Sequence, residues 1–426
     1  MFKIGALKHR KVELQLLGLV YIYILTAVTV LILTGVNNTE AKLPLLAGTL
    51  VILTFGSVSF YWYKSGFKAD QFLLPMVAFL STTGLVFMFR LNSFYAVRQM
   101  VWLIIGLVIL VLVTHFFRNY LFLSDYKYLY VLTGVLFLIL PIFLGVEQGG
   151  AKSWLNFRFF QFQPSEFVKI LLVLFLTSFL AENRSALAAG TRNFGLISVP
   201  GLKYWGPLVA MWAISLLLLV FQKDLGAALI YFGTFLAMLY IATSRLAYVF
   251  TGLILFLLGA GLSYQLFDHV RMRVQVWLNP WPYSDTAGYQ VIQSLIALAS
   301  GGIGGSGFNA GYPKDIPAVH TDFIFSAIGE ELGFLGGAGI IIIYLLIAYR
   351  GLKIALASRD EFSMLLAAGL TVLISFQSFI IIAGVTKLLP LTGVTLPFVS
   401  YGGSSLVANF VLLGLLLNVS NEAVQR

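Results

Sequence analysis

Long apolar runs separated by short polar segments occupy almost the whole chain. Twelve of these runs are near the length of roughly 20 residues that a helix needs to cross the hydrocarbon core of a bilayer. They lie at roughly 14–36, 43–62, 71–90, 98–117, 126–146, 164–181, 206–221, 225–242, 246–267, 323–349, 363–386 and 404–420. Because lipid offers backbone groups no hydrogen bonds, such spans fold as helices. The pattern predicts an all-α polytopic membrane protein with about twelve spans.

The composition agrees with this pattern. The mean hydropathy is +0.93, and 59% of the residues are hydrophobic while only 10% are charged. A soluble chain of 426 residues could not cover that much apolar surface. Twelve spans place both termini on one side of the membrane, and more of the Lys and Arg residues fall on that side. The positive-inside rule therefore predicts that both termini are cytoplasmic.

The net charge and the cysteine count exclude several classes of partner and of chemistry. The net charge of +10 would suggest nucleic acid for a soluble protein, but basic cytoplasmic loops explain it here. We therefore expect membrane lipid around the protein and no nucleic-acid partner. The chain has no cysteine, which excludes disulfides, thiolate metal sites and cysteine nucleophiles.

Two connections, 147–163 and 268–322, are expected to be structured and extracytoplasmic. The second is long for a membrane protein, and long ordered loops are usually functional. Residues 289–300 within it are predicted to form a short helix. Lys152, Arg158, Arg271 and Arg273 supply positive charge in these two connections.

The segment 319-VHTDFIFSAIGEELGF-334 places ionisable groups where an apolar run begins. Thr321 is a plausible N-cap with Asp322 in the first turn, since carboxylates are favoured there. Capping alone does not require His320 beside them. Glu330 and Glu331 would lie about 12–14 Å deeper by helical rise, too far to form an acid–base pair with Asp322. We expect these two glutamates to pack against another polar helix.

Two further polar groups lie within or between spans. Glu166 and Lys169, in 161-QFQPSEFVKILL-172, are neighbours on one helical face, and Pro164 suits the first turn of that helix. They form either a structural ion pair or part of a polar cavity that opens outward. Asp224, in the turn 221-FQKDLGAAL-229, either caps a helix or lines the same cavity.

The segment 387-KLLPLTGVTLPFVSYGGSS-405 interrupts the helical pattern with two prolines and three glycines. Non-helical backbone at membrane depth is tolerated only where it is buried in protein or lines a cavity. This segment is expected to form part of the cavity wall.

Together these motifs resemble the SEDS family, the shape, elongation, division and sporulation proteins related to RodA, FtsW and SpoVE. The matching pieces are GAKSW with FQPSEFVK, QKDLG, WLNPWPYSDTAGYQ with SGGIGGSG, HTDFIFSAIGEELG and LPLTGVTLPFVSYGGSS, in the order of the family. The resemblance implies a ten-helix core at 67–426, so that residues 1–66, with a basic segment and two helices, would be an N-terminal addition.

The sequence departs from the family pattern at three positions. Lys223 stands where the family usually has the proline of QPDLG. Ala318 stands where a glutamate usually precedes the histidine of HTDF by two residues. Near Ile381 the family often has a polar residue. Asp322, Glu166 and Lys169 are retained.

The resemblance implies peptidoglycan glycosyltransferase activity on lipid II, a disaccharide-pentapeptide on undecaprenyl pyrophosphate. It implies that Asp322 is catalytic, that the protein lies in the bacterial cytoplasmic membrane, and that a class B penicillin-binding protein, a transpeptidase, is the partner. Asp322 would act as the general base for the acceptor hydroxyl, or would hold a divalent cation such as Mg²⁺ or Mn²⁺ against the pyrophosphate.

The other candidate residues are assigned either to substrate binding or to a polar cavity. The predicted substrate-binding residues are Arg271, Arg273, Lys152, Arg158, His320 and Thr321. The predicted cavity residues are Gln163, Ser165, Glu166, Lys169, Asp224 and Tyr401. A lipid II flippase is the alternative function, since Glu330 and Glu331 suggest a deeper polar path. A third possibility is a non-catalytic scaffold for a partner, in which Asp322 would be dispensable.

Overall fold

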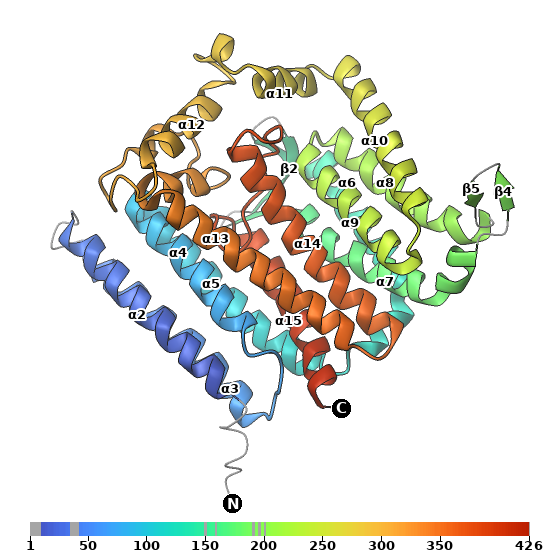
Figure 1. Ribbon diagram of the computed structural model, residues 1–426, viewed down its shortest axis with the longest axis horizontal. Coiled ribbons are helices and arrows are strands. Elements are labelled where there is room, and N and C mark those ends of the chain that lie inside the picture. Colours follow the sequence, from blue (N-terminus) through green and yellow to red (C-terminus); the bar gives the residue numbers. More distant parts are fainter. Residues whose placement is uncertain are drawn as a thin grey trace, which may run out of the picture. The chain divides into compact units, whose positions relative to one another are not determined.

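The structure is a computed structural model that describes residues 10–34, 42–148, 151–157, 160–189, 192–194, 197–199 and 202–425. The chain forms two compact units. Unit 1 comprises Met1–Phe116, Met272–Arg350 and Gln377–Arg426, and unit 2 comprises Phe117–Arg271 and Gly351–Phe376. Helices α13 (Ile324–Ala357) and α14 (Glu361–Val385), which are labelled in Figure 1, each contribute residues to both units.

Unit 1 contains most of the long helices at the two ends of the sequence. They are α2 (Lys11–Leu33), α3 (Lys42–Lys64), α4 (Leu73–Leu91), α5 (Ser93–Phe116), α15 (Gly403–Gln425) and parts of α13 (Ile324–Ala357) and α14 (Glu361–Val385). Helix α4 is buried along nearly its whole length and packs against α2 and α5. Gly84 allows close packing, because a Cβ there would collide with the backbone carbonyl of Val399.

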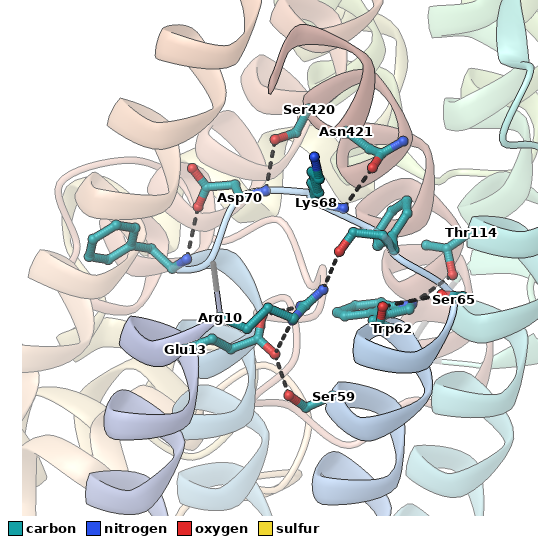
Figure 2. Close-up of polar contacts among 12 residues, drawn as sticks. Arg10, Glu13, Ser59, Trp62, Ser65, Lys68, Asp70, Thr114, Ser420 and Asn421 are labelled. Atoms are coloured by element: carbon teal, nitrogen blue, oxygen red, sulfur yellow. Dashed lines mark hydrogen bonds and ion pairs between the residues drawn. The ribbon is translucent and has the colours of Figure 1, made fainter. Parts of the chain in front are cut away.

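Helices α2 and α3 form an N-terminal hairpin that is attached to the rest of unit 1 by buried polar contacts (Figure 2). Arg10 pairs with Glu13, and Ser59 donates to Glu13 Oε1 at 2.5 Å. Arg10 Nη1 also donates to the carbonyl of Phe67 at 2.7 Å. Each charged group thus has a partner, as burial requires.

The segment before α4 connects to the C-terminal helix at the same end of unit 1 (Figure 2). The amides of Lys68 and Asp70 donate to Asn421 Oδ1 at 2.7 Å and Ser420 Oγ at 2.9 Å. Arg350 Nε donates to Asp70 Oδ2 at 2.8 Å. Because Arg10 contacts Phe67 and Lys68 contacts Asn421, both described ends of the chain lie at one end of this unit.

The opposite end of unit 1 is formed by the long connection before α13. It contains most of α11 (Asp268–Leu278), η2 (Trp281–Tyr283), α12 (Tyr289–Gly301) and η3 (Pro313–Asp315). The Ser294 hydroxyl on α12 lies 2.7 Å from that of Ser326 and donates to the carbonyl of Val385 at 3.1 Å. These bonds join α12 to the start of α13 and the end of α14.

Unit 2 is built from α6 (Lys127–Leu144), α7 (Pro164–Ala189), α8 (Leu202–Phe221), α9 (Leu225–Thr243) and α10 (Leu246–Leu266), with η1 (Tyr120–Tyr126) before α6. Strands β1 (Val146–Gln148), β2 (Ala151–Asn156) and β3 (Gln161–Phe162) form an antiparallel sheet in the connection before α7, in the order β1-β2-β3. Strands β4 (Arg192–Phe194) and β5 (Ile197–Val199) pair between α7 and α8.

The predicted spans are confirmed within the described residues. Eleven helices there are long and apolar enough to cross a membrane, and the apolar part of α8 at Trp205–Phe221 is shorter. The chain is therefore a polytopic all-α membrane protein. The short helix predicted at 289–300 is α12. Helix α11 was not anticipated, because its sequence DHVRMRVQVWL is too polar for a span.

Candidate active site

Asp322 lies in the turn immediately before α13. The helix begins at Ile324, so the prediction that Thr321 is the N-cap and Asp322 lies in the first turn is wrong by two residues. The Thr321 hydroxyl instead lies 2.8 Å from the carbonyl of Ala318 and 2.7 Å from Asp322 Oδ1. The hydroxyl is thus bound to nearby oxygens, whereas an N-cap hydroxyl would bond to a backbone amide of the first helical turn.

Burial raises the pKa of Asp322 above its ordinary value, while the hydrogen bond from Thr321 and the positive charge of Arg273 act to lower the pKa. The side chain is only half-buried, so it can still be reached. Such a carboxylate holds a proton more readily than an exposed aspartate and is still ionised over part of the accessible pH range. That is the property of a general base.

The non-helical segment between α14 and α15 surrounds this turn. The Ser400 hydroxyl donates to the carbonyl of Thr321, and the Tyr401 amide donates to the carbonyl of His320 at 2.8 Å. Arg273 Nη1 on α11 lies 3.5 Å from the carbonyl of Thr392. A Cβ built on Gly393 would lie 3.9 Å from Asp322 Oδ2. The segment therefore contacts the turn through the Ser400 side chain and the Tyr401 backbone.

Two residues of α5 belong to the site but were not predicted. Gln99 Nε2 donates to the carbonyl of Ser400 at 3.1 Å, and Gln99 Oε1 accepts from the amide of Gly402 at 3.3 Å. The Tyr95 ring stacks on His320, with centroids 4.1 Å apart and planes 14° apart. The sequence shows only that a tyrosine and a glutamine stand near the polar start of a span; their contacts with residues far along the chain appear only in the structure.

His320 and Tyr401 therefore lie in one aromatic cluster beside Asp322. The Tyr95 ring centroid is 4.9 Å from that of Tyr401, and Phe94 packs edge-on against Tyr95 at 5.6 Å. Burial lowers the pKa of His320, so its ring is neutral at neutral pH. Phe94 exposes 57% of its surface. The cluster presents aromatic surface next to a carboxylate.

The helix segment that follows Asp322 is short, because α13 is interrupted at Gly333. This residue has φ 65° and ψ −166°, a conformation that is essentially restricted to glycine. Residues 302–312, hereafter the 302–312 loop, supply partners for the interrupted backbone. The amides of Phe334 and Leu335 donate to the carbonyls of Gly302 and Ile303 at 2.9 and 3.2 Å.

Glu330 and Glu331 hold that loop. Glu331 Oε1 accepts from Arg90 Nε on α4 at 2.9 Å, and Oε2 accepts from the amide of Asn309 at 3.1 Å. Glu330 Oε1 accepts from the amide of Tyr312 at 2.7 Å. The expected packing against another polar helix is confirmed for Glu331, which pairs with Arg90. The contact of both glutamates with the loop was not foreseen.

The predicted cavity residues of unit 2 form a second polar cluster. Glu166 Oε2 and Lys169 Nζ are 2.5 Å apart, and both side chains are buried. Asp224 Oδ1 accepts from the amide of Ala227 and caps α9. Asp224 Oδ2 lies 3.2 Å from Gln163 Nε2 and 3.4 Å from Ser165 Oγ. Asp224 is therefore both a helix cap and a member of this cluster.

The predicted basic residues are distributed over both units. Arg273 belongs to unit 1, whereas Lys152 and Arg271 belong to unit 2, and Arg158 lies outside the described residues. Lys152 Nζ donates to the carbonyl of Ile142 at 2.9 Å. Arg271 contacts Asp268 and the carbonyl of Gln265. Of the basic residues that the structure describes in the predicted set, Arg273 is the one that acts electrostatically on Asp322.

The arrangement defines a class of protein: a multi-spanning membrane protein with a single carboxylate held in a polar, aromatic site just outside its spanning helices. A family model described as a cell cycle protein, FtsW/RodA/SpoVE, matches residues 65–425. The chain belongs to this family, the SEDS proteins that its motifs resemble.

Curated relatives agree with this assignment. The chain is 43% identical over 364 residues to the peptidoglycan glycosyltransferase RodA of Mycobacterium leprae, covering 83% of this chain and 78% of that protein. It is 40% identical over 423 residues to the protein of the same name from Mycobacterium tuberculosis, covering 96% and 90%. It is 34% identical over 369 residues to stage V sporulation protein E of Bacillus subtilis, covering 82% and 96%.

Solved structures share the fold. The rod shape determining protein RodA of Thermus thermophilus matches with a TM-score of 0.59 and 27% identity, covering 84% of this chain and 98% of that chain. A chain from a peptidoglycan synthase complex, described for its structural coordination of polymerization and crosslinking, matches with a TM-score of 0.68 and 28% identity, covering 84% and 99%.

Proposed function

We propose that this protein is a peptidoglycan glycosyltransferase that polymerises lipid II into glycan strands at the outer face of the bacterial cytoplasmic membrane. The observation that supports this most directly is Asp322, a half-buried carboxylate with a raised pKa at the end of a spanning helix. It lies in a chain whose relatives over most of their length are named peptidoglycan glycosyltransferases.

In the proposed reaction Asp322 takes the proton from the 4-hydroxyl of the acceptor sugar. The oxygen of that hydroxyl then bonds to the anomeric carbon of the donor sugar. The bond from that carbon to the lipid pyrophosphate breaks, and the pyrophosphate leaves with the electron pair. A separate acid is not needed, because pyrophosphate is a good leaving group. Asp322 later releases its proton to water.

The leaving pyrophosphate needs positive charge, and Arg273 is the best placed of the described candidates. Its charge already acts on Asp322, and its guanidinium lies at the segment that contacts the Asp322 turn. Charge-assisted hydrogen bonds from arginine are strong and can be bidentate. Arg271, Lys152 and Arg158 stay candidate phosphate contacts from the sequence alone.

The aromatic cluster is proposed to contact the sugar rings. Pyranose rings present a face of C–H groups, and burying such a face against an aromatic ring is favourable. Tyr95, His320 and Tyr401 lie beside Asp322, and Phe94 is largely exposed next to them. Thr321 would orient the carboxylate. Gln163, Ser165, Glu166, Lys169 and Asp224 are proposed to line a polar cavity in unit 2.

Among the residues that the structure describes, the site offers a divalent cation only one protein carboxylate, that of Asp322. Within the described ranges, no three His, Cys, Asp or Glu side chains come together as a ligand group. Mg²⁺, however, is often held by one or two carboxylates together with substrate phosphates. Asp322 can supply one such carboxylate. A cation held there would neutralise charge on the pyrophosphate, and Asp322 and the phosphates would be its ligands.

The partner and the orientation are also proposals. A structural neighbour belongs to a complex that couples polymerization with crosslinking, which supports a class B penicillin-binding protein as the transpeptidase partner here. Both described ends lie beside the start of α4, whereas His320 of the Asp322 turn stacks on Tyr95, just beyond the other end of α4. With basic segments inside, both termini would be cytoplasmic and Asp322 would face outward.

The flippase alternative loses its main support from the sequence. Glu330 and Glu331 suggested a deeper polar path, but the structure uses them to hold the 302–312 loop and Arg90. Their carboxylates are buried. These contacts favour chemistry at one face over transport.

The test is polymerisation of labelled lipid II by the purified protein, with and without its transpeptidase partner. Asp322→Asn retains the size of the side chain and removes the base, so the rate should fall by about 100-fold or more. Asp315→Asn is the matched control, because Asp315 is exposed in the same connection and should leave the rate unchanged. Equal rates for Asp322→Asn and wild type would refute the assignment. Lipid II movement across liposomes without polymerisation would favour the flippase.

A further inference from the structure

A hydrogen bond from Asn309 links the 302–312 loop to the N-terminal hairpin. Asn309 Nδ2 donates to the backbone carbonyl of Thr34, the C-cap residue of α2, at 2.7 Å. The final carbonyls of a helix have no partner within it. Asn309 therefore satisfies a backbone group of the hairpin with a side chain of the loop.

The same residue also contacts the helix that follows Asp322. The backbone amide of Asn309 donates to Glu331 Oε2 at 3.1 Å. Beside it, Phe308 packs edge-on against Phe87 of α4 with centroids 5.7 Å apart. Arg90 Nη2 donates to the carbonyl of Gly311 at 3.0 Å. The loop is thus fixed between α4, α2 and the Glu330–Glu331 pair.

The hairpin is a firm attachment point because α2 is held along its length. At its start, Arg10 and Glu13 form the buried polar group with Ser59 (Figure 2). In its middle, the Tyr23 hydroxyl lies 3.1 Å from the Thr83 hydroxyl of α4. At its end, the Thr34 carbonyl accepts from Asn309. Motion of the loop would therefore break a contact with an element that is fixed elsewhere.

We propose that Asn309 is a positioning residue: through it the N-terminal hairpin holds the 302–312 loop, and the loop fixes the helix segment that follows Asp322. This inference rests on the proposed function, because it concerns the alignment of Asp322 for that reaction. Backbone bonds from the loop to Glu330, Glu331, Phe334 and Leu335 transmit the constraint.

The backbone conformation of Asn309 makes it possible to remove the side chain without changing the backbone. Its φ is +64°, a left-handed conformation that asparagine and glycine adopt more readily than other residues. Asn309→Gly keeps this conformation and removes the donor. Asn309→Asp keeps the shape and places an acceptor against the Thr34 carbonyl. Ala310→Gly is the matched control, because Ala310 is exposed in the same loop and donates no side-chain hydrogen bond.

In the full-length protein, Asn309→Gly and Asn309→Asp should lower kcat for lipid II polymerisation about fivefold, the effect of one lost hydrogen bond on the alignment of the site. KM should remain at the wild-type value, and the thermal unfolding midpoint should fall only slightly, because one partly exposed hydrogen bond is lost. All parameters of Ala310→Gly should remain at the wild-type values. A loss of stability with unchanged kcat would make Asn309 a purely structural residue. Wild-type kcat in both variants would overturn the proposal.

A second measurement does not depend on activity. Hydrogen exchange of the amides at 303–308 and 320–324 should be faster in Asn309→Gly than in wild type, whereas Ala310→Gly should affect its own loop alone. Unchanged exchange at 320–324 would overturn the inference even if the enzyme is active. If wild type polymerises no lipid II, the proposed function fails, and hydrogen exchange still decides whether the hairpin fixes this segment.

A rescue experiment uses the absence of cysteine from the chain. The pair Thr34→Cys and Asn309→Cys, joined by a short thiol-specific crosslinker, should regain the kcat that the unlinked pair loses. Failure to crosslink in membranes would contradict the contact itself. Crosslinking without regained kcat would contradict its role in positioning.

Discussion

The single hydroxyl proton of Thr321 faces two acceptors, Asp322 Oδ1 at 2.7 Å and the carbonyl of Ala318 at 2.8 Å. A hydroxyl donates one hydrogen bond at a time. The bond to an ionised carboxylate is the stronger of the two. Thr321 therefore favours the ionised form of Asp322, and its proton can turn to Ala318 once Asp322 is protonated.

This relationship predicts a shift in the pH dependence of polymerisation. A base works when ionised, so activity should fall as the pH drops through the raised pKa of Asp322. Thr321→Val removes the hydrogen bond that lowers this pKa and should move the acidic limb of the kcat/KM profile, which reports the free enzyme, to higher pH. Thr321→Ser keeps the hydroxyl and should leave the limb in place. A limb that moves to lower pH in Thr321→Val would contradict the role of Thr321.

The spans and the order of motifs could be predicted because they depend on local sequence. Apolar runs of sufficient length dictate helices in lipid whatever their neighbours are. Pro164 likewise fixed the start of α7. The start of α13 was misplaced by two residues, because the Thr321 hydroxyl bonds to nearby acceptors and the helix begins only at Ile324.

The missed parts of the site depend on contacts between distant segments. Tyr95 and Gln99 contact residues more than 200 positions away, which no local pattern records. Glu330 and Glu331 look like intramembrane carboxylates in the sequence. Their partners, the amides of Tyr312 and Asn309, become available only when the glycine-rich 302–312 loop folds back over the interrupted helix.

The interruption of α13 at Gly333 predicts a sharp difference between two glycines of one helix. Gly333→Ala forces a side chain into φ 65° and ψ −166° and against the backbone of Gly305 and Ile303. It should destabilise the protein by at least about 1–3 kcal/mol. Gly339→Ala has open space around its Cβ and should be neutral or stabilising by up to about 1 kcal/mol. Unfolding midpoints in detergent measure both, and equal midpoints would exclude strain at Gly333.

The buried polar group of the N-terminal hairpin predicts a second pair of effects. Ser59 is buried and donates to Glu13, so Ser59→Ala should cost about 1.5–3 kcal/mol, as expected for a hydrogen bond to a charged group. Ser57, two residues earlier on α3, is exposed and donates only to the carbonyl of Thr54. Ser57→Ala should be near neutral. Chemical denaturation would show whether the two serines differ, and similar costs would mean that Glu13 does not need Ser59.

The buried pair Glu166–Lys169 allows a test of structural against functional roles. Lys169→Met leaves Glu166 as an uncompensated buried charge and should destabilise the protein by about 3–5 kcal/mol. Glu166→Gln together with Lys169→Met removes both charges, and replacement of a buried pair by neutral groups often restores stability. The double variant should therefore unfold near the wild-type midpoint.

Activity of that double variant separates the two interpretations that the sequence left open. If the pair lines a substrate cavity, the stable double variant should polymerise lipid II at least about tenfold more slowly than wild type, because a charge that contacts substrate or reacting groups is lost. If the pair only supports the fold, the double variant should polymerise at the wild-type rate. Measuring both the midpoint and the rate on one preparation prevents misfolding from being read as lost catalysis. Because Asp224 and Ser165 share the cluster, Asp224→Asn should reduce the rate in the same direction under the first interpretation and leave it unchanged under the second.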